Sequence, residues 1–133
     1  MTNIQKAMKD LFGGSCYGYC LGYLFGESKD IKYLTEGFLE GWKRGYIDDD
    51  GYVSDPLRYI TMLCGTKYRD IEKPEIKTLS GLPPGNHIVE LKNPNGGSHF
   101  VITNNKKELI FDPFYVSDSW KLQLPLSYRK YIL

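Results

Sequence analysis

A cysteine near the N-terminus stands where a protein would place a reactive thiol. Cys16 follows two glycines and a serine, and a run with helical character begins at this residue. The first turn of a helix presents unpaired N–H groups and the positive end of the helix dipole. A thiolate is favoured there, and cysteines at helix N-termini can have pKa values well below the usual value of about 8.5. Cys16 is therefore the candidate nucleophile.

A histidine and an aspartate in the second half of the sequence are the candidate partners of this thiol. Two apolar runs, 99–103 and 108–112, are joined by four polar residues, which predicts a β-hairpin. If the turn is centred in the polar segment, the numbers of paired residues sum to 211. His99 then lies opposite Asp112, with Cβ atoms about 4.5–5.5 Å apart. A hydrogen bond between them would fix the tautomer of the ring and stabilise its charged form.

Cysteine, histidine and an orienting acid are the components of a nucleophilic triad. Cys16 would be the nucleophile, His99 the general base toward the thiol and then the general acid toward the leaving amine, and Asp112 the group that orients His99. The chemistry predicted is hydrolysis of an amide bond. Transfer of the acyl group to an amine uses the same triad and remains a weaker alternative.

Helical spacing, turn residues and alternation predict the elements that must position these side chains. Ser15 is the expected N-cap of the helix that starts at Cys16. Gly18, Gly22 and Gly26 form a stripe on that helix, which we expect a strand to approach closely. The predicted helices cover 3–12, 16–25, 30–45 and 55–65, and the predicted strands cover 87–92, 99–103 and 108–112.

The order and local sequence of the candidate residues resemble the papain-like cysteine peptidases. The pattern is most similar to their compact bacterial branch, which includes the bacteriocin-leader-processing peptidases. There, a histidine followed by aromatic and aliphatic residues leads through a short hairpin to Asp-Pro. Here the pattern is His-Phe-Val-Ile at 99–102 and Ile-Phe-Asp-Pro at 110–113. The segments 14–17, 48–55 and 127–129 also resemble phage- and prophage-encoded proteins of this fold.

This resemblance implies an α+β fold of the papain-like type, with N-terminal helices packed on a C-terminal antiparallel β-sheet. It implies one cysteine hydrolase domain over 1–133, with Cys16, His99 and Asp112 as the catalytic residues. The expected function is that of a cysteine peptidase or amidase acting on a peptide, cell-wall peptides included. No metal and no organic cofactor is implied.

One position departs from the family pattern. The papain-like enzymes usually carry a glutamine about six residues before the nucleophile, which donates a hydrogen bond to the oxyanion. This sequence has Asp10 at that distance from Cys16, and Gln5 lies further upstream. A carboxylate cannot donate such a bond. A non-catalytic binding or phage-structural module that keeps the fold is therefore the alternative function.

Size, charge and hydropathy exclude several other classes of protein. The chain of 133 residues fits one domain. Seventeen basic and sixteen acidic residues give a net charge of +1, which offers no broad basic surface for nucleic acid. Apolar runs are far shorter than the roughly 18 residues that span a membrane, and the N-terminal segment does not resemble a secretory signal. We therefore expect a cytoplasmic protein with no nucleic-acid partner and no membrane span.

Several residues offer alternatives to this interpretation. Cys20 is the rival nucleophile, although core packing is expected of it, and Cys64 is expected to be structural. Cys16 and Cys20 lack a second close Cys/His pair, so a zinc site is disfavoured. His87 starts a strand with no acid opposite it. The segment 48–51, Asp-Asp-Asp-Gly, lacks the alternating ligands of a calcium loop and is expected to be a plain turn.

Overall fold

Helices precede strands in this chain, which confirms the predicted α+β class. The computed structural model describes residues 2–94, 97–114 and 123–133. Within these ranges the helices are α1 (Asn3–Leu11), α2 (Cys16–Phe25), α3 (Ile31–Lys43), α4 (Pro56–Cys64) and the short 3-10 helix η1 (Leu79–Gly81). The strands are β1 (Asp70–Glu72), β2 (His87–Lys92), β3 (Ser98–Thr103), β4 (Leu109–Phe111), β5 (Leu124–Tyr128) and β6 (Lys130–Ile132). Of the described helices, none has the length and apolar character needed to cross a membrane.

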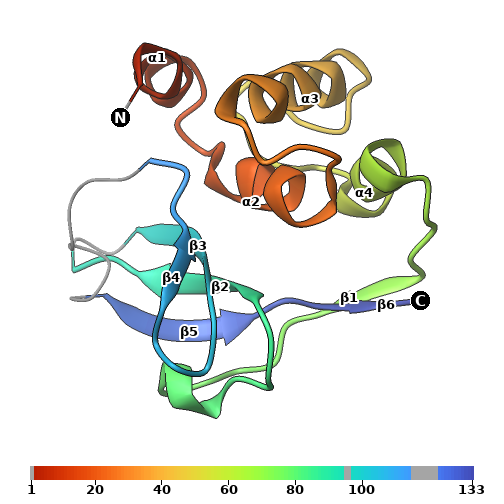
Figure 1. The fold of residues 1–133 in the computed structure, drawn as a ribbon. Helices are drawn as coiled ribbons and strands as arrows, with labels where there is room; N and C mark the ends of the chain where they lie inside the picture. Colours follow the sequence, from red (N-terminus) through yellow and green to blue (C-terminus); the bar gives the residue numbers. More distant parts are fainter. Residues whose placement is uncertain (1, 95–96, 115–122) are drawn as a thin grey trace.

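Helix α2 lies at the centre of the fold. The described strands form a four-stranded antiparallel sheet in the order β4-β3-β2-β5 and a two-stranded antiparallel sheet of β1 and β6. Figure 1 shows the four α-helices on one side of the larger sheet, with α2 between the other helices and the strands. Helix α2 contacts β3, α3 and α4. Cys16 therefore begins the helix that is most tightly enclosed by the rest of the chain.

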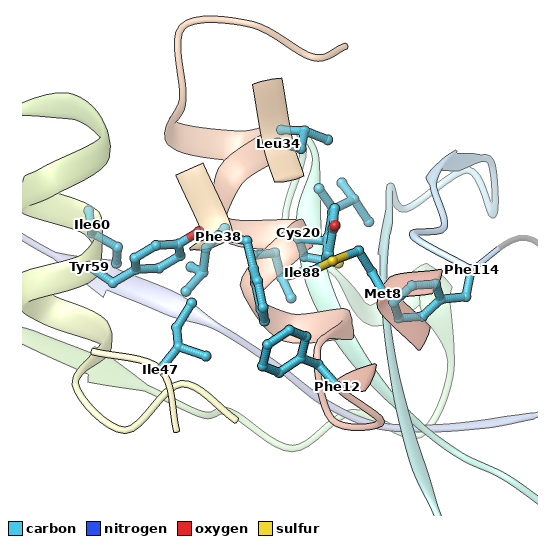
Figure 2. Close-up of a cluster of buried hydrophobic side chains, with 13 residues drawn as sticks. Met8, Phe12, Cys20, Leu34, Phe38, Ile47, Tyr59, Ile60, Ile88 and Phe114 are labelled. Carbon is cyan, nitrogen blue, oxygen red and sulfur yellow. The ribbon is translucent and has the colours of Figure 1, made fainter. Parts of the chain in front are cut away.

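Hydrophobic clusters cover both faces of the larger sheet. The larger cluster fills the space between the helices and the sheet, and Figure 2 shows Phe12, Phe38 and Cys20 within it. The smaller cluster lies on the opposite face. Because successive residues of a strand point to opposite faces, Ile88 joins the larger cluster and Val89 the smaller one. The sheet that carries His99 is therefore fixed from both sides.

The predicted register of the β3–β4 hairpin is wrong. A sum of 211 would pair Phe111 with Phe100, whereas the structure pairs Phe111 with Ile102 and Leu109 with Thr103. The register shifts between Ile102 and Thr103, so the ladder contains an irregularity. Strand β4 also ends at Phe111. Asp112 therefore lies beyond the ladder and is not the directly opposed partner of the histidine.

The turn of this hairpin explains the difference. The side-chain oxygen of Asn104 accepts hydrogen bonds from the N–H groups of Lys106 and Glu108, at 3.0 and 3.1 Å. Lys107 adopts a positive φ of 62°. An asparagine side chain can hold a turn in this way, and it holds the turn open as far as Glu108. The predicted pairing assumed a symmetric turn and did not include the hydrogen bonds made by the side chain of Asn104. Because of these bonds the turn is longer, and β4 begins at Leu109.

Helix α3, and not a strand, approaches the glycine stripe of α2. A Cβ atom on Gly18 would lie 2.9 Å from ring atoms of Phe38, and one on Gly22 would lie 3.3 Å from a methyl group of Leu34. Both neighbours belong to α3. The expectation of close approach is correct and the expected partner is wrong, because the sheet packs against another face of α2.

Three strands were not predicted, and their sequences explain why. Strand β5 contains Pro125, and proline argues against a strand unless the strand lies at an edge, as β5 does. Strands β1 and β6 have three residues each, too few for alternation to be recognised. Their pairing, Asp70 with Ile132 through Glu72 with Lys130, brings the end of the chain beside the segment that follows α4.

Replacing Gly18 by alanine is expected to lower the free energy of unfolding by about 1–3 kcal/mol, because the buried ring of Phe38 leaves no room for a methyl group. The matched control is Gly37→Ala in α3, where a Cβ atom would lie 3.5 Å from Leu63. There the helix propensity of alanine should leave stability unchanged or raise it by up to about 1 kcal/mol. Urea unfolding measures both variants. Equal free energies of unfolding would contradict the close packing of α2 against α3.

Candidate active site

The three residues predicted to act together meet at one pocket. Cys16 is the first residue of α2 and is partly exposed, His99 is the second residue of β3, and Asp112 directly follows β4. Nε2 of His99 lies 2.9 Å from Oδ1 of Asp112. The three side chains line one hollow of about 260 Å³. The predicted contact of His99 with Asp112 is confirmed, although the strand register from which it was derived is wrong.

The surroundings of His99 hold a proton on its ring. Burial by itself lowers the pKa of His99, but the hydrogen bonds with Asp112 and Cys16, together with the charges of both, raise it from 6.5 to about 9. Nε2 is bonded to Asp112, so the nitrogen left for Cys16 is Nδ1. The side chains of His99 and Asp112 are only 17% and 6% exposed, so water screens this pair weakly. An imidazolium therefore stands beside the sulfur at neutral pH.

Contacts with the N-terminal helix hold Asp112 in place. Oδ1 of Asp112 also accepts a hydrogen bond from the N–H of Phe114, at 3.1 Å. Nε2 of Gln5 donates to the carbonyl oxygen of Pro113, at 2.8 Å. Gln5 and Thr2 form the capping box that begins α1. The sequence signals this capping box through its Thr-x-x-Gln spacing, but it gives no sign that Gln5 also anchors the turn that carries the acid.

The turn at 48–51 supports the loop before Cys16. The N–H of Gly14 donates to the carbonyl oxygen of Asp50, at 2.9 Å. A Cβ atom on Gly14 would lie 2.6 Å from the ring of Tyr52, so a larger residue would require this exposed ring to move. Gly51 has a φ of +92°, which favours glycine, and its Cα packs on Phe12. This supporting role was not predicted, because the two segments lie far apart in the sequence.

The aspartates of this turn bond to protein groups. Oδ1 of Asp48 accepts hydrogen bonds from the N–H groups of Asp50 and Tyr52, at 2.9 and 3.0 Å. Oδ1 of Asp49 accepts one from Nε1 of Trp42. These bonds confirm the prediction of a plain turn. Across the described ranges, no three His, Cys, Asp or Glu side chains are grouped so that they could hold a metal ion.

Ser15 precedes α2 as predicted but does not cap it. Its backbone is helical, with φ −80° and ψ −5°, and its side chain makes no capping hydrogen bond. The predicted capping interaction is wrong, because an N-cap side chain needs the extended backbone that Ser15 lacks. The N–H of Cys16 belongs to the first turn of α2, where N–H groups have no partner within the helix. It is therefore a suitable donor to an anion formed next to the sulfur.

The other cysteines and the second histidine occupy different environments. Cys20 is fully buried, as expected, and its Sγ donates to the carbonyl oxygen of Phe100 at 3.5 Å. Burial, and then the charges of Cys16 and Asp112, raise the pKa of Cys20 well above its ordinary value. It therefore remains a thiol. Cys64 is exposed at the end of α4.

His87 holds a turn and does not contact the site. Its Nε2 lies 3.1 Å from the carbonyl oxygen of Pro83 and 3.2 Å from that of Pro84. Its ring packs edge-on against Tyr128. These contacts agree with the prediction that His87 has no acid as its partner.

Hollows lie on two sides of Cys16. The smaller contains His99 and Asp112 and is also lined by Lys9, Asn93 and Gln123. The larger, of about 750 Å³, is a cleft between the helices and the sheet, and Cys16 lines it as well. We call it the large cleft. Its other lining residues include Tyr17, Tyr52, Asp70, Glu90, Phe100 and Arg129. An extended polymer could therefore bind across Cys16 and occupy both hollows.

Comparisons with known proteins do not add to this description. No protein-family model, no curated protein and no solved structure matches the chain. The function is therefore argued from the chemistry of the site.

Replacing Asp112 by asparagine is expected to lower the pKa of His99 from about 9 toward its ordinary value of 6.5 or below, because burial then acts against a weaker partner. The measurement is an NMR titration of the imidazole signals, with His87→Ala to assign them. An unchanged pKa of His99 in the variant would contradict the role of Asp112.

The free energy of unfolding should also depend on pH, through the titration of His99. The pKa of His99 is higher in the folded protein than its ordinary value, so the stabilisation is complete below about pH 6.5 and is lost as the pH rises to about 9. The free energy of unfolding of the wild type should therefore fall across this interval, and it should fall less in Asp112→Asn. Parallel pH profiles for the two proteins would count against this account.

Proposed function

We propose that this protein is a papain-like cysteine peptidase or amidase that hydrolyses an amide bond of a peptide. Cys16 would be the nucleophile, His99 the base and acid, and Asp112 the group that orients the ring. The observation that carries the proposal is the hydrogen bond between His99 and Asp112 in the same pocket as Cys16, the first residue of a helix. A buried structural cysteine would need neither the charged ring nor the open cleft.

Acylation begins from the thiolate of Cys16 and the imidazolium of His99. The sulfur attacks the carbonyl carbon, a C–S bond forms, and the carbonyl electrons move to the oxygen. The N–H of Cys16 donates to this oxyanion. His99 then gives its Nδ1 proton to the amide nitrogen, the C–N bond breaks, and the amine leaves. A thioester on Cys16 remains.

Deacylation reverses these roles with water as the acceptor. The neutral ring of His99 takes a proton from water, and the water oxygen attacks the thioester carbon. The C–S bond then breaks, the carboxylic acid leaves, and the thiolate–imidazolium pair is restored. An amine in place of water would give transfer, with the same residues in the same roles.

The second donor to the oxyanion differs from that of the papain-like family. Asp10 cannot donate from its carboxylate, and Nε2 of Gln5 is already bonded to Pro113. Lys9, Asn93 and Gln123 line the pocket with Cys16, and each carries a side-chain donor. One of them would complete the oxyanion hole. The loss of a single donor of this kind typically lowers kcat by about 10²–10³-fold.

An extended peptide is the substrate class that the shape of the site favours. The large cleft continues from Cys16 away from His99, and its lining combines aromatic rings with charged side chains. A peptide, cell-wall peptides included, could bind along it with the scissile bond at the sulfur.

A non-catalytic binding or phage-structural module is the second candidate function. The missing upstream glutamine favours it, because Asp10 stands in its position and a carboxylate cannot donate a hydrogen bond to an oxyanion. The two candidates differ in their dependence on the sulfur. A Cys16→Ser protein that retains full biological activity would favour the module, and one that loses it would favour the enzyme.

Alkylation by iodoacetamide at about pH 6 tests the activated thiol. Cys16 is expected to react at least about tenfold faster than Cys64, because a thiolate is the reactive species and an ordinary thiol is almost fully protonated at this pH. His99→Ala should reduce the rate at Cys16 to that at Cys64. Mass spectrometry of the peptides reads both cysteines in one sample. Equal rates in the wild type would count heavily against the enzyme.

A further inference from the structure

We propose that the large cleft binds a cationic group of the substrate through Glu90, so that the preferred peptides carry an amine or guanidinium in the part that lies along this cleft. This inference rests on the proposed function, because it names the substrate class of the same site. Its basis is the position, the support and the exposure of one carboxylate on the floor of the cleft.

The pairing of the strands places Glu90 in the same cleft as the sulfur. Glu90 lies opposite Phe100 in the β2–β3 ladder. The ring of Phe100 lies 4.9 Å from the ring of Tyr17, the residue after Cys16. Cys16, Tyr17, Phe100 and Glu90 all line the large cleft, so the carboxylate and the sulfur belong to one continuous hollow. A peptide that extends from the sulfur along this cleft reaches the carboxylate.

A buried arginine fixes this carboxylate. Arg129 is 7% exposed, and its Nη1 donates to Oγ of Ser127 at 2.8 Å. Its Nη2 lies 3.5 Å from Oε1 of Glu90, and Oγ of Ser127 donates to the same oxygen at 3.3 Å. The guanidinium also lies over the ring of Phe100, 5.1 Å from its centre. Arg129 therefore positions Glu90 and has little surface left for a ligand.

Both Glu90 and Arg129 line the cleft, but the side chain of Glu90 is the more exposed of the two. The side chain of Glu90 is 24% exposed and that of Arg129 is 6% exposed. Among the described residues, both bonds that hold Glu90 end on Oε1, so Oε2 has no partner from this part of the chain and can accept from a bound group. A carboxylate of a substrate would have to displace Glu90 from Arg129. A cation needs no such displacement.

The charges around the cleft act in the same direction. Among the described residues that line it, the exposed or partly exposed charges are those of Asp55, Asp70, Glu90 and Lys73. With Arg129 included, these lining residues comprise three acids and two bases, an excess of one negative charge. Asp55 is in addition paired with Arg58, at 3.5 Å. The walls on both sides are aromatic, with Tyr17 and Tyr52, and aromatic faces attract cations.

Three alkylating peptides of equal length test the charge preference at Cys16. They are the N-chloroacetyl derivatives of Gly-Lys amide, Gly-Gln amide and Gly-Glu amide, in which the sulfur displaces chloride and the charged side chain lies within reach of the cleft. Each rate at Cys16 is divided by the rate at Cys64 in the same sample. The lysine reagent is expected to react about five- to tenfold faster than the glutamate reagent.

Glu90→Gln should bring this ratio to about one, because it removes the charge and keeps the shape. The matched control is Glu72→Gln, which makes the same charge change on an exposed residue of β1 outside the cleft. The control should leave the ratio unchanged. Circular dichroism establishes that both variants are folded. If Glu90→Gln unfolds, Glu90→Asp replaces it and should keep the preference for the lysine reagent.

The wild type alone also provides a test. Raising the ionic strength from about 0.05 M to about 1 M should reduce the preference, because salt screens charges in an open cleft. A ratio of one in the wild type, a preference for the glutamate reagent, or a ratio that Glu90→Gln leaves unchanged would overturn the inference. The proposed function fails separately, if the neutral glutamine reagent reacts no faster at Cys16 than at Cys64.

Discussion

The hydrogen bond between Asp112 and His99 is the interaction on which the chemistry of this site depends. An imidazole enclosed as His99 is would lose its proton, because burial disfavours the charged ring. The carboxylate 2.9 Å away reverses that preference, and because it is bonded to Nε2 it leaves Nδ1 for another partner. Cys16 then lies in the same pocket as the charged ring, as the first residue of α2. Without the acid, the same three elements would hold an ordinary buried histidine next to an ordinary cysteine.

Much of the remaining structure serves to bring these groups from distant parts of the sequence to one place. Helix α2 is enclosed by α3, α4 and β3, so its N-terminus has a fixed position relative to the sheet. The turn at 48–51 supports the loop before Cys16, and Gln5 anchors the turn after Asp112. Each support comes from a segment that carries no chemistry itself. The loops of the site are therefore held by the helical half of the fold.

The sequence predicted the elements that depend on residues close together in the chain, and it missed the contacts that depend on residues far apart in the chain. The helix at 16–25, with Cys16 as its first residue, and the strand at 87–92 follow from local signals, and the structure has them with these bounds. The hairpin register failed because the side chain of Asn104 widens the turn. The partner of the glycine stripe, the contact of Gln5 with Pro113 and the strands β1, β5 and β6 depend on tertiary packing. The contact of His99 with Asp112 was predicted from an incorrect register. It forms nevertheless, because Asp112 follows directly after the end of β4 and still reaches the histidine from there.

The ultraviolet absorbance of the thiolate, measured as the difference between the wild type and Cys16→Ser across pH, tests the central claim most directly. A thiolate–imidazolium pair predicts about one thiolate per chain already at about pH 6, and this absorbance should disappear when His99 or Asp112 is replaced. Absorbance that appears only near the pH at which free thiols ionise, and that is the same in His99→Ala, would contradict the account.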